Sequence, residues 1–87
     1  MKYVIFKDKN MFLPVIFPDH ITHSEVKIGD SEVFSAGFLN IKTAGFVEIL
    51  PEKSESLNIG PKEIDQSILI RAVNNFGTAY FLDFDDI

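Results

Sequence analysis

The chain has 87 residues, of which 46% are hydrophobic and nine are phenylalanine, so it can form one domain with a small core. It has no cysteine, which excludes disulfides, zinc–thiolate sites and thiol nucleophiles. Eight basic and thirteen acidic residues give a net charge of −5, which disfavours direct binding of nucleic acid and favours a protein partner with a basic surface. We therefore expect residues 1–87 to form a single, acidic domain.

The N-terminal segment, MKYVIFKDKN, has an apolar run of only four residues, which ends at Lys7. A signal peptide needs a longer apolar run, and a membrane-spanning helix needs about 20 apolar residues. Together with the absence of cysteine, this predicts a cytoplasmic protein that does not bind membranes.

The first elements predicted by the sequence are the two strands of a β-hairpin. Tyr3–Phe6 is β-branched and aromatic, residues 7–10 form a polar turn, and Met11–Phe17 returns as the second strand. Pro14 cannot donate a hydrogen bond to a neighbouring strand. The second strand is therefore expected at a sheet edge or with a bulge.

A short helix, of two turns at most, is predicted after Pro18. Thr22 and Glu25 have the spacing of a capping box, in which each side chain satisfies a free backbone N–H of the helix start. Gly29 suits the end of this helix.

Residues 31–50 predict a second hairpin, with its turn near residues 40–43. Strict alternation assigns one face of its first strand to Val33, Ser35, Gly37, Leu39 and Ile41. The other face then belongs to Phe34, Ala36, Phe38 and Asn40. Because both faces are largely apolar, we interpret Phe34 and Phe38 as interface candidates and expect a homodimer. Gly37 and Gly45 are expected at bulges or close backbone approaches.

The most regular predicted helix covers residues 61–76, where Ile64, Ile68, Ala72 and Phe76 recur at i+4 spacing. Pro61 suits its first position. Residues 78–84 predict a last strand. The order β-β-α-β-β-α-β indicates an α+β fold, a small antiparallel sheet of about five strands covered by two helices on one side.

The segment KSESLNIGP precedes this helix and admits two interpretations. Free amides at a helix start attract anions, and the ligand-binding candidates there are Lys53, Ser54, Ser56, Asn58, Gly60 and Lys62. Nearby acids oppose an anion: Glu52, Glu55 and Glu63. The favoured interpretation is a structural loop in which Leu57 and Ile59 are buried and the serines bond backbone. An anion or nucleotide site is the alternative.

His20 and His23 are three residues apart, with Asp19 and Glu25 nearby, which is a possible ligand set for a divalent metal. Strong metal motifs have more ligands at stricter spacing. We therefore favour two surface histidines and expect no metal or other cofactor.

The C-terminal acids Asp83, Asp85 and Asp86 lack the glycine and the final glutamate of a calcium loop. They are interpreted as interface candidates that present charge to a basic partner. The chain has no G-x-S-x-G motif, and no histidine is placed as a base for a serine. The sequence therefore predicts a protein that is not an enzyme.

Three segments, VFSAGFLNI, KSESLNIGP and EIDQSILIRAV, resemble a group of small uncharacterised proteins encoded by bacteriophages and prophages. The resemblance extends from Met1 to about Asn74. It implies a mobile-element origin and a bacterial cytoplasm, but it implies no activity or catalytic residue. We expect a protein-protein interaction module, such as an inhibitor of a host or anti-phage defence protein.

Overall fold

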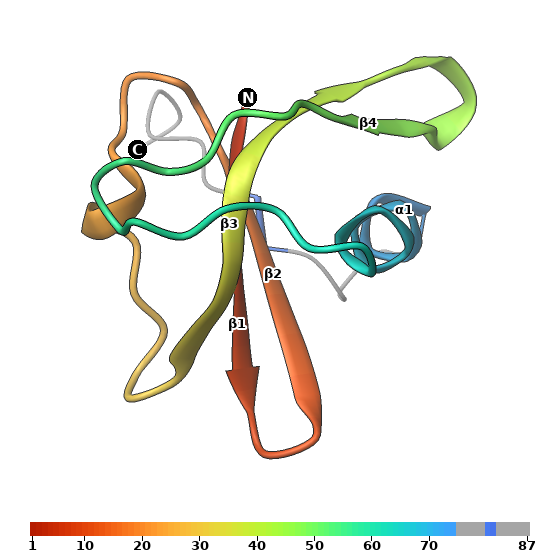
Figure 1. Ribbon diagram of the computed structural model, residues 1–87. Coiled ribbons are helices and arrows are strands. Elements are labelled where there is room, and N and C mark those ends of the chain that lie inside the picture. The colour runs from red at the N-terminus through yellow and green to blue at the C-terminus, as the bar shows by residue number, and fades with distance from the viewer. Residues whose placement is uncertain (75–79, 82–87) are drawn as a thin grey trace.

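The computed structural model describes residues 1–74 and 80–81 and shows an α+β fold (Figure 1). Four antiparallel strands lie in the order β4-β3-β1-β2. The elements are β1 (Lys2–Asp8), β2 (Met11–Phe17), β3 (Glu32–Ile41), β4 (Val47–Ile49) and helix α1 (Asp65–Asn74). A two-residue strand, β5 (Tyr80–Phe81), pairs with β2 in parallel. The α+β class is confirmed, but an antiparallel sheet of five strands and a second α-helix are not.

The hairpin of β1 and β2 is confirmed, with Asp8 opposite Met11 across a two-residue turn. Pro14 lies opposite Ile5, which in this register is a position without cross-strand hydrogen bonds. Its missing N–H therefore faces away from β1. On that side the structure describes a partner strand only from Val15 onward, so the proline breaks no hydrogen bond between described strands.

Strand β3 contains a bulge that the sequence did not predict at this place. Its register with β1 shifts after Ile5, which leaves Phe34 as the extra residue. Phe34 therefore shares a face with Ser35, and Val33 moves to the face of Ala36. The strict alternation expected for this strand is wrong at Val33 and Phe34. Gly37 was expected at a bulge or at a close backbone approach. It lies at a close approach, because a side chain there would crowd a tyrosine ring.

The first predicted helix is only a three-residue 3₁₀ helix, η1 (His23–Glu25). The Glu25 carboxylate accepts hydrogen bonds from the N–H and the hydroxyl of Thr22, at 3.0 and 2.7 Å, so the expected capping contact exists. Val26 has an extended backbone and ends the turn, and its side chain is buried with Ile21. These two side chains reach the sheet from an irregular segment, which a helix could not allow.

Helix α1 begins four residues after Pro61, because residues 63–64 form a turn and the Asp65 N–H donates to the Lys62 carbonyl. Its buried positions are Asp65, Leu69 and Ala72, whereas Ile64 is 44% exposed. The expected end at Phe76 and most of the predicted strand 78–84 lie outside the described residues. Within the described ranges, no helix has the length and apolar character needed to cross a bilayer.

Both faces of the sheet are covered by the chain itself (Figure 1). We call the side packed against α1 the helix face, with a core of Tyr3, Ile5, Ile16, Leu39, Val47 and Leu69. The opposite side is the loop face, with a core of Val4, Phe6, Val15, Phe17, Ile21, Val26 and Ala36. Leu57 and Ile59 pack on the loop face. Self-association was predicted because both faces of one strand are apolar. Since the chain itself covers both faces, this reason no longer holds, and self-association stays a prediction.

Candidate functional site

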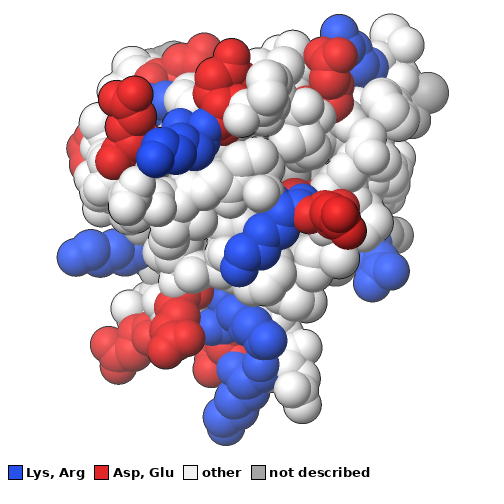
Figure 2. Space-filling view, viewed as in Figure 1, with Lys and Arg blue, Asp and Glu red and all other residues white. Residues whose placement is uncertain are grey.

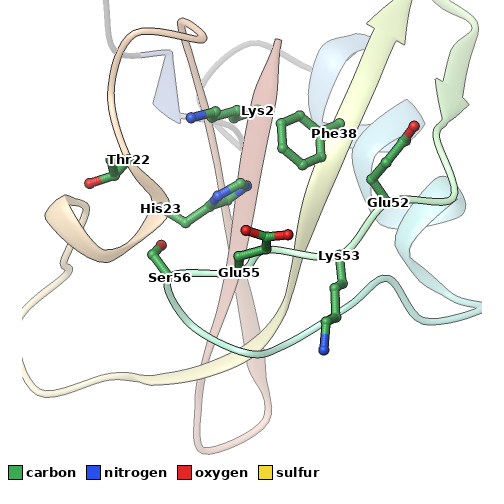
Figure 3. A pocket seen from close by; sticks show the side chains of 8 residues that line it. All are labelled: Lys2, Thr22, His23, Phe38, Glu52, Lys53, Glu55 and Ser56. Carbon is green, nitrogen blue, oxygen red and sulfur yellow. The ribbon is translucent and has the colours of Figure 1, made fainter.

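A pocket of about 510 Å³ opens on the loop face (Figure 3). Its eight lining residues come from β1, the segment around η1, β3 and the loop after β4. They include three of the predicted site residues, namely Lys53, Ser56 and Phe38. We call it the loop-face pocket.

The buried ring of His23 forms one wall of this pocket. It is 3% exposed and stands edge-on between the rings of Phe17 and Phe38, with centroids 5.5 and 5.2 Å away. Its Nε2 lies 2.8 Å from the carbonyl oxygen of Gly37. Because a carbonyl only accepts, Nε2 carries the proton and donates.

Burial is the main cause that lowers the pKa of His23 below its usual value. The hydrogen bond to Gly37 opposes this effect, and the nearby charge of Lys2 adds to it. His23 is therefore a neutral imidazole at neutral pH, and its Nδ1 is left with a lone pair.

The expectation of two surface histidines is wrong for His23 and correct for His20, which is exposed. The side chain of His23 enters the core because it finds aromatic neighbours and a backbone acceptor there. One ring is buried and the other is in water, and no group of three potential metal ligands exists among the described residues.

Both lysines of the loop-face pocket are held by acceptors of the same chain. The Lys2 ammonium donates to the Ile21 carbonyl at 2.9 Å and lies 5.8 Å from the ring centroid of Phe38. The Lys53 ammonium donates to Oδ1 of Asn58 at 3.0 Å. Figure 3 shows it pointing away from Phe38. Each ammonium therefore donates one hydrogen bond within the chain.

The two glutamates of the pocket have no such partners. Glu52 and Glu55 are exposed, and neither side-chain carboxylate makes a hydrogen bond or ion pair with any residue that the structure describes. Glu48 differs, since it accepts from Asn40 at 3.1 Å and pairs with Lys42 at 3.5 Å. The pocket therefore presents two carboxylates without a hydrogen-bond or ion-pair partner among the described residues, beside two lysines that bond neutral oxygens.

The loop of residues 53–60 closes on itself as a small bridge. Ser54 and Ile59 exchange backbone hydrogen bonds of 2.8 and 3.3 Å, and the buried Ser54 hydroxyl accepts from the Leu57 N–H at 3.3 Å. The Ser56 hydroxyl accepts from the Ser24 N–H at 3.3 Å. The predicted bonding of serines to backbone is confirmed, while Leu57 and Ile59 are only partly buried.

The remaining site candidates do not join the pocket. The Lys62 ammonium lies 3.9 Å from the ring centroid of Phe34, on the helix face, and Asn58 holds Lys53. Gly60 packs beside Lys53 without lining the pocket. The interface candidates Phe34 and Phe38 thus lie on opposite faces. Those at positions 83, 85 and 86 lie outside the described residues.

Sequence reasoning missed a buried polar cluster on the helix face. Asp65 accepts from the Tyr3 hydroxyl at 2.6 Å, the Ser35 hydroxyl at 2.7 Å and the Lys62 N–H at 2.9 Å. Tyr3, Ser35 and Asp65 have no exposed surface. Burial, followed by the bond and charge of Asp65, raises the pKa of Tyr3 far above its usual value. The cluster is closed to substrates and every partner in it is satisfied.

Comparisons of the chain with protein-family models, with curated proteins and with solved structures found no match. Its function is therefore argued from the chemistry of its own residues. Among them, the loop-face pocket combines a cavity, an aromatic ring and charges without partners.

Proposed function

We propose that the protein is a non-enzymatic protein-protein interaction module whose loop face binds a partner with a basic surface. The observation that carries this proposal is the state of the charges at the loop-face pocket. The ammoniums of Lys2 and Lys53 are bonded within the chain, whereas the carboxylates of Glu52 and Glu55 have no partner among the described residues. Complementary charge gives an interface its specificity and speeds association, and the net charge of −5 acts in the same direction.

The absence of a catalytic arrangement among the described residues supports a non-enzymatic role. The serine hydroxyl bonded to a carboxylate, Ser35 to Asp65, is sealed in the core. The buried histidine ring donates to a backbone carbonyl rather than accepting from a hydroxyl. A general base needs access to the proton that it removes, and the Ser35–Asp65 pair provides no such access.

An anion or nucleotide site at the Lys53–Lys62 loop is the weaker alternative. The Lys53 ammonium is bonded to Asn58, and the Lys62 ammonium lies over Phe34. Glu52 and Glu55 would repel a phosphate in the adjoining pocket. Figure 2 likewise shows acidic and basic side chains interspersed on this side of the molecule.

The resemblance to phage-encoded proteins extends the proposal to a target. The partner would be a protein of the bacterial cytoplasm, and covering its basic surface would inhibit it. A basic surface is typical of proteins that bind nucleic acid, which include defence factors. Self-association into a homodimer is proposed separately, and light scattering at micromolar concentration tests it.

Affinity purification from a bacterial extract, with quantitative identification of the retained proteins, tests the proposed function. Three baits are compared: the wild type, Glu52→Lys/Glu55→Lys, and the control Glu32→Lys/Glu63→Lys. The control changes the charge equally at two exposed positions away from the pocket. We expect basic proteins that the wild type and control retain and the pocket variant loses.

Retention of the same proteins by all three baits, or by none, would contradict the proposal. Melting with ATP addresses the alternative in the same preparations. Stabilisation by ATP that disappears in Lys53→Ala would favour the nucleotide site, because a ligand that binds the native state raises its stability.

A further inference from the structure

The outer edge of β4 is one end of the sheet. β4 pairs with β3 on one side, and no described strand pairs with it on the other. The Phe46 carbonyl and the Leu50 N–H bond β3 or the residue that follows it. Alternate residues of an antiparallel strand face the same neighbour, so Val47 and Ile49 direct their backbone groups away from the sheet. These are the groups to which a further strand would bond.

A glutamine side chain of α1 takes the place of such a strand at Val47. Nε2 of Gln66 donates to the outward carbonyl of Val47 at 2.9 Å. A strand added at this edge would bring a backbone N–H to the same carbonyl. In the turn before β4, the amide of Asn74 likewise donates to the Gly45 carbonyl at 3.2 Å. Two side chains of one helix thus bond carbonyls along this segment.

The other end of the edge is blocked by a proline. The residue two positions beyond Ile49 is Pro51, which has no N–H to donate. Between Pro51 and the bonded Val47, Ile49 keeps both outward groups without a partner among the described residues. A row of such bonds holds an added strand, so one open residue is a poor template for pairing.

Without these blocks the edge would be open to another chain. Phe46 and Ile41, which lie just before β4 and opposite Val47, are 51% and 38% exposed. A hollow of about 430 Å³ lies between β4 and the start of α1, and Ile49 and Gln66 contribute to its lining. Exposed apolar side chains beside unpaired backbone groups favour pairing with a strand of another molecule.

We propose that Gln66 guards the outer edge of β4 and keeps it from pairing with the same edge of a second copy of the chain. A second copy is the competing partner because identical edges can pair antiparallel about a two-fold axis, and every copy carries this edge. The homodimer proposed above would use another surface. The partner of the loop face plays no part in this inference.

Light scattering of two matched variants over a range of concentrations tests the inference. Gln66→Ala/Pro51→Val removes the donor to Val47 and restores an N–H at position 51. Gln66→Lys/Pro51→Val makes the same proline change but keeps a donor at position 66. We expect the mass of the alanine variant to rise toward twice the wild-type value as its concentration increases. The lysine variant should keep the wild-type mass. If replacing the proline unfolds the chain, the single variants Gln66→Ala and Gln66→Lys provide the same comparison.

Hydrogen exchange of the backbone amides locates the contact. In the wild type, the outward N–H of Ile49 should exchange faster than the N–H of Leu50, which donates to Phe38. Association of the alanine variant should slow exchange at Ile49. An alanine variant with the wild-type mass at every concentration, or a lysine variant that associates equally, would overturn the inference. So would an Ile49 amide that is protected in the wild type as strongly as that of Leu50.

Discussion

The two faces of the sheet are closed by different means, and the comparison separates the parts of the molecule that hold the fold from those available for binding. On the helix face, one regular element, α1, covers the core, and the buried polar atoms of Asp65 and its partners are all bonded. On the loop face, irregular segments cover the core and leave a pocket.

The difference follows from the backbone. A helix presents its apolar positions as one stripe and satisfies its own amides, so it covers the core with one regular element, although hollows remain where α1 meets β2 and β4. An irregular segment reaches the sheet with single side chains, such as Ile21 and Val26, and must bond its backbone locally. Between those anchors the loop face keeps space and unpaired charge at Glu52 and Glu55.

The largest expected effect is on the helix face, from Asp65→Ala. The variant leaves the Tyr3 and Ser35 hydroxyls buried without their acceptor and removes the bond from Lys62. We expect a loss of about 3–5 kcal/mol in the free energy of unfolding, measured by urea denaturation. Because a chain of this size is only modestly stable, Ser35→Ala serves as the milder variant, costing about 1–3 kcal/mol. A small effect of both would contradict a structural role for the cluster.

Truncating one leucine on each face compares the packing directly. Leu69 on α1 is fully buried, and Leu69→Ala should cost about 2–5 kcal/mol. Leu57 is partly exposed on a loop that can relax, so Leu57→Ala should cost only about 1–2 kcal/mol. Urea unfolding of both variants gives the ranking. The reverse order would mean that the loop is packed as firmly as the helix.

The pH dependence of stability reports on the loop face. The unfolded His23 takes up a proton near its usual pKa of 6.5, whereas burial lowers the pKa in the folded chain. Its contribution to stability is therefore complete above pH 6.5 and is lost as the pH falls toward the lowered folded value. Glu25 and Glu48 also have lowered pKa values. Their contributions to stability are lost only below about pH 4.5.

Urea unfolding at pH 7.5, 6.5 and 5.5 measures this dependence. His23→Gln should flatten it, because the amide does not titrate and can still donate to Gly37. His20→Gln, at an exposed position, should leave it as in the wild type. A dependence that survives His23→Gln would show that another group causes it.

The smallest expected effect is from Glu52→Gln/Glu55→Gln. Since neither carboxylate has a partner among the described residues, the urea midpoint should stay at the wild-type value. This outcome would separate binding from folding at the loop-face pocket. A clear destabilisation would indicate that the carboxylates support the fold, and would weaken the case for a partner.

The first hairpin and the middle of α1 were predictable because their patterns are local. The strand pattern around Pro14 and the i+4 recurrence through Ile68 depend only on neighbouring residues. The bulge at Phe34 was not predictable, because it depends on pairing with β1. The cap of Thr22 and Glu25 was found, but the buried segment beyond it ended the helix after one turn.

The buried polar residues were missed for a related reason. Asp65 bonds Tyr3 and Ser35, which are 62 and 30 residues away, and His23 bonds Gly37, 14 residues away. From sequence alone, a polar residue is expected at the surface unless its distant hydrogen-bond partner is known. At the pocket, Lys53 and Ser56 were predicted from loop chemistry.

The same sequence argument did not identify the two glutamates of the pocket as site residues. Glu52 and Glu55 entered the sequence argument only as charges that oppose an anion. Their importance depends on where the two lysine ammoniums are bonded. Lys2 bonds Ile21, 19 residues away, and Lys53 bonds Asn58 within the folded loop.

Site-specific photo-crosslinking in bacterial cells tests most directly the claim that the loop face binds and the helix face does not. A photoreactive residue replaces Lys53 at the loop-face pocket or, as the control, the exposed Ser67 on α1. The account predicts crosslinks to a basic protein from position 53, their loss on Glu52→Lys/Glu55→Lys, and none from position 67. Equal crosslinking from position 67, or crosslinks from position 53 that survive the charge reversal, would contradict it.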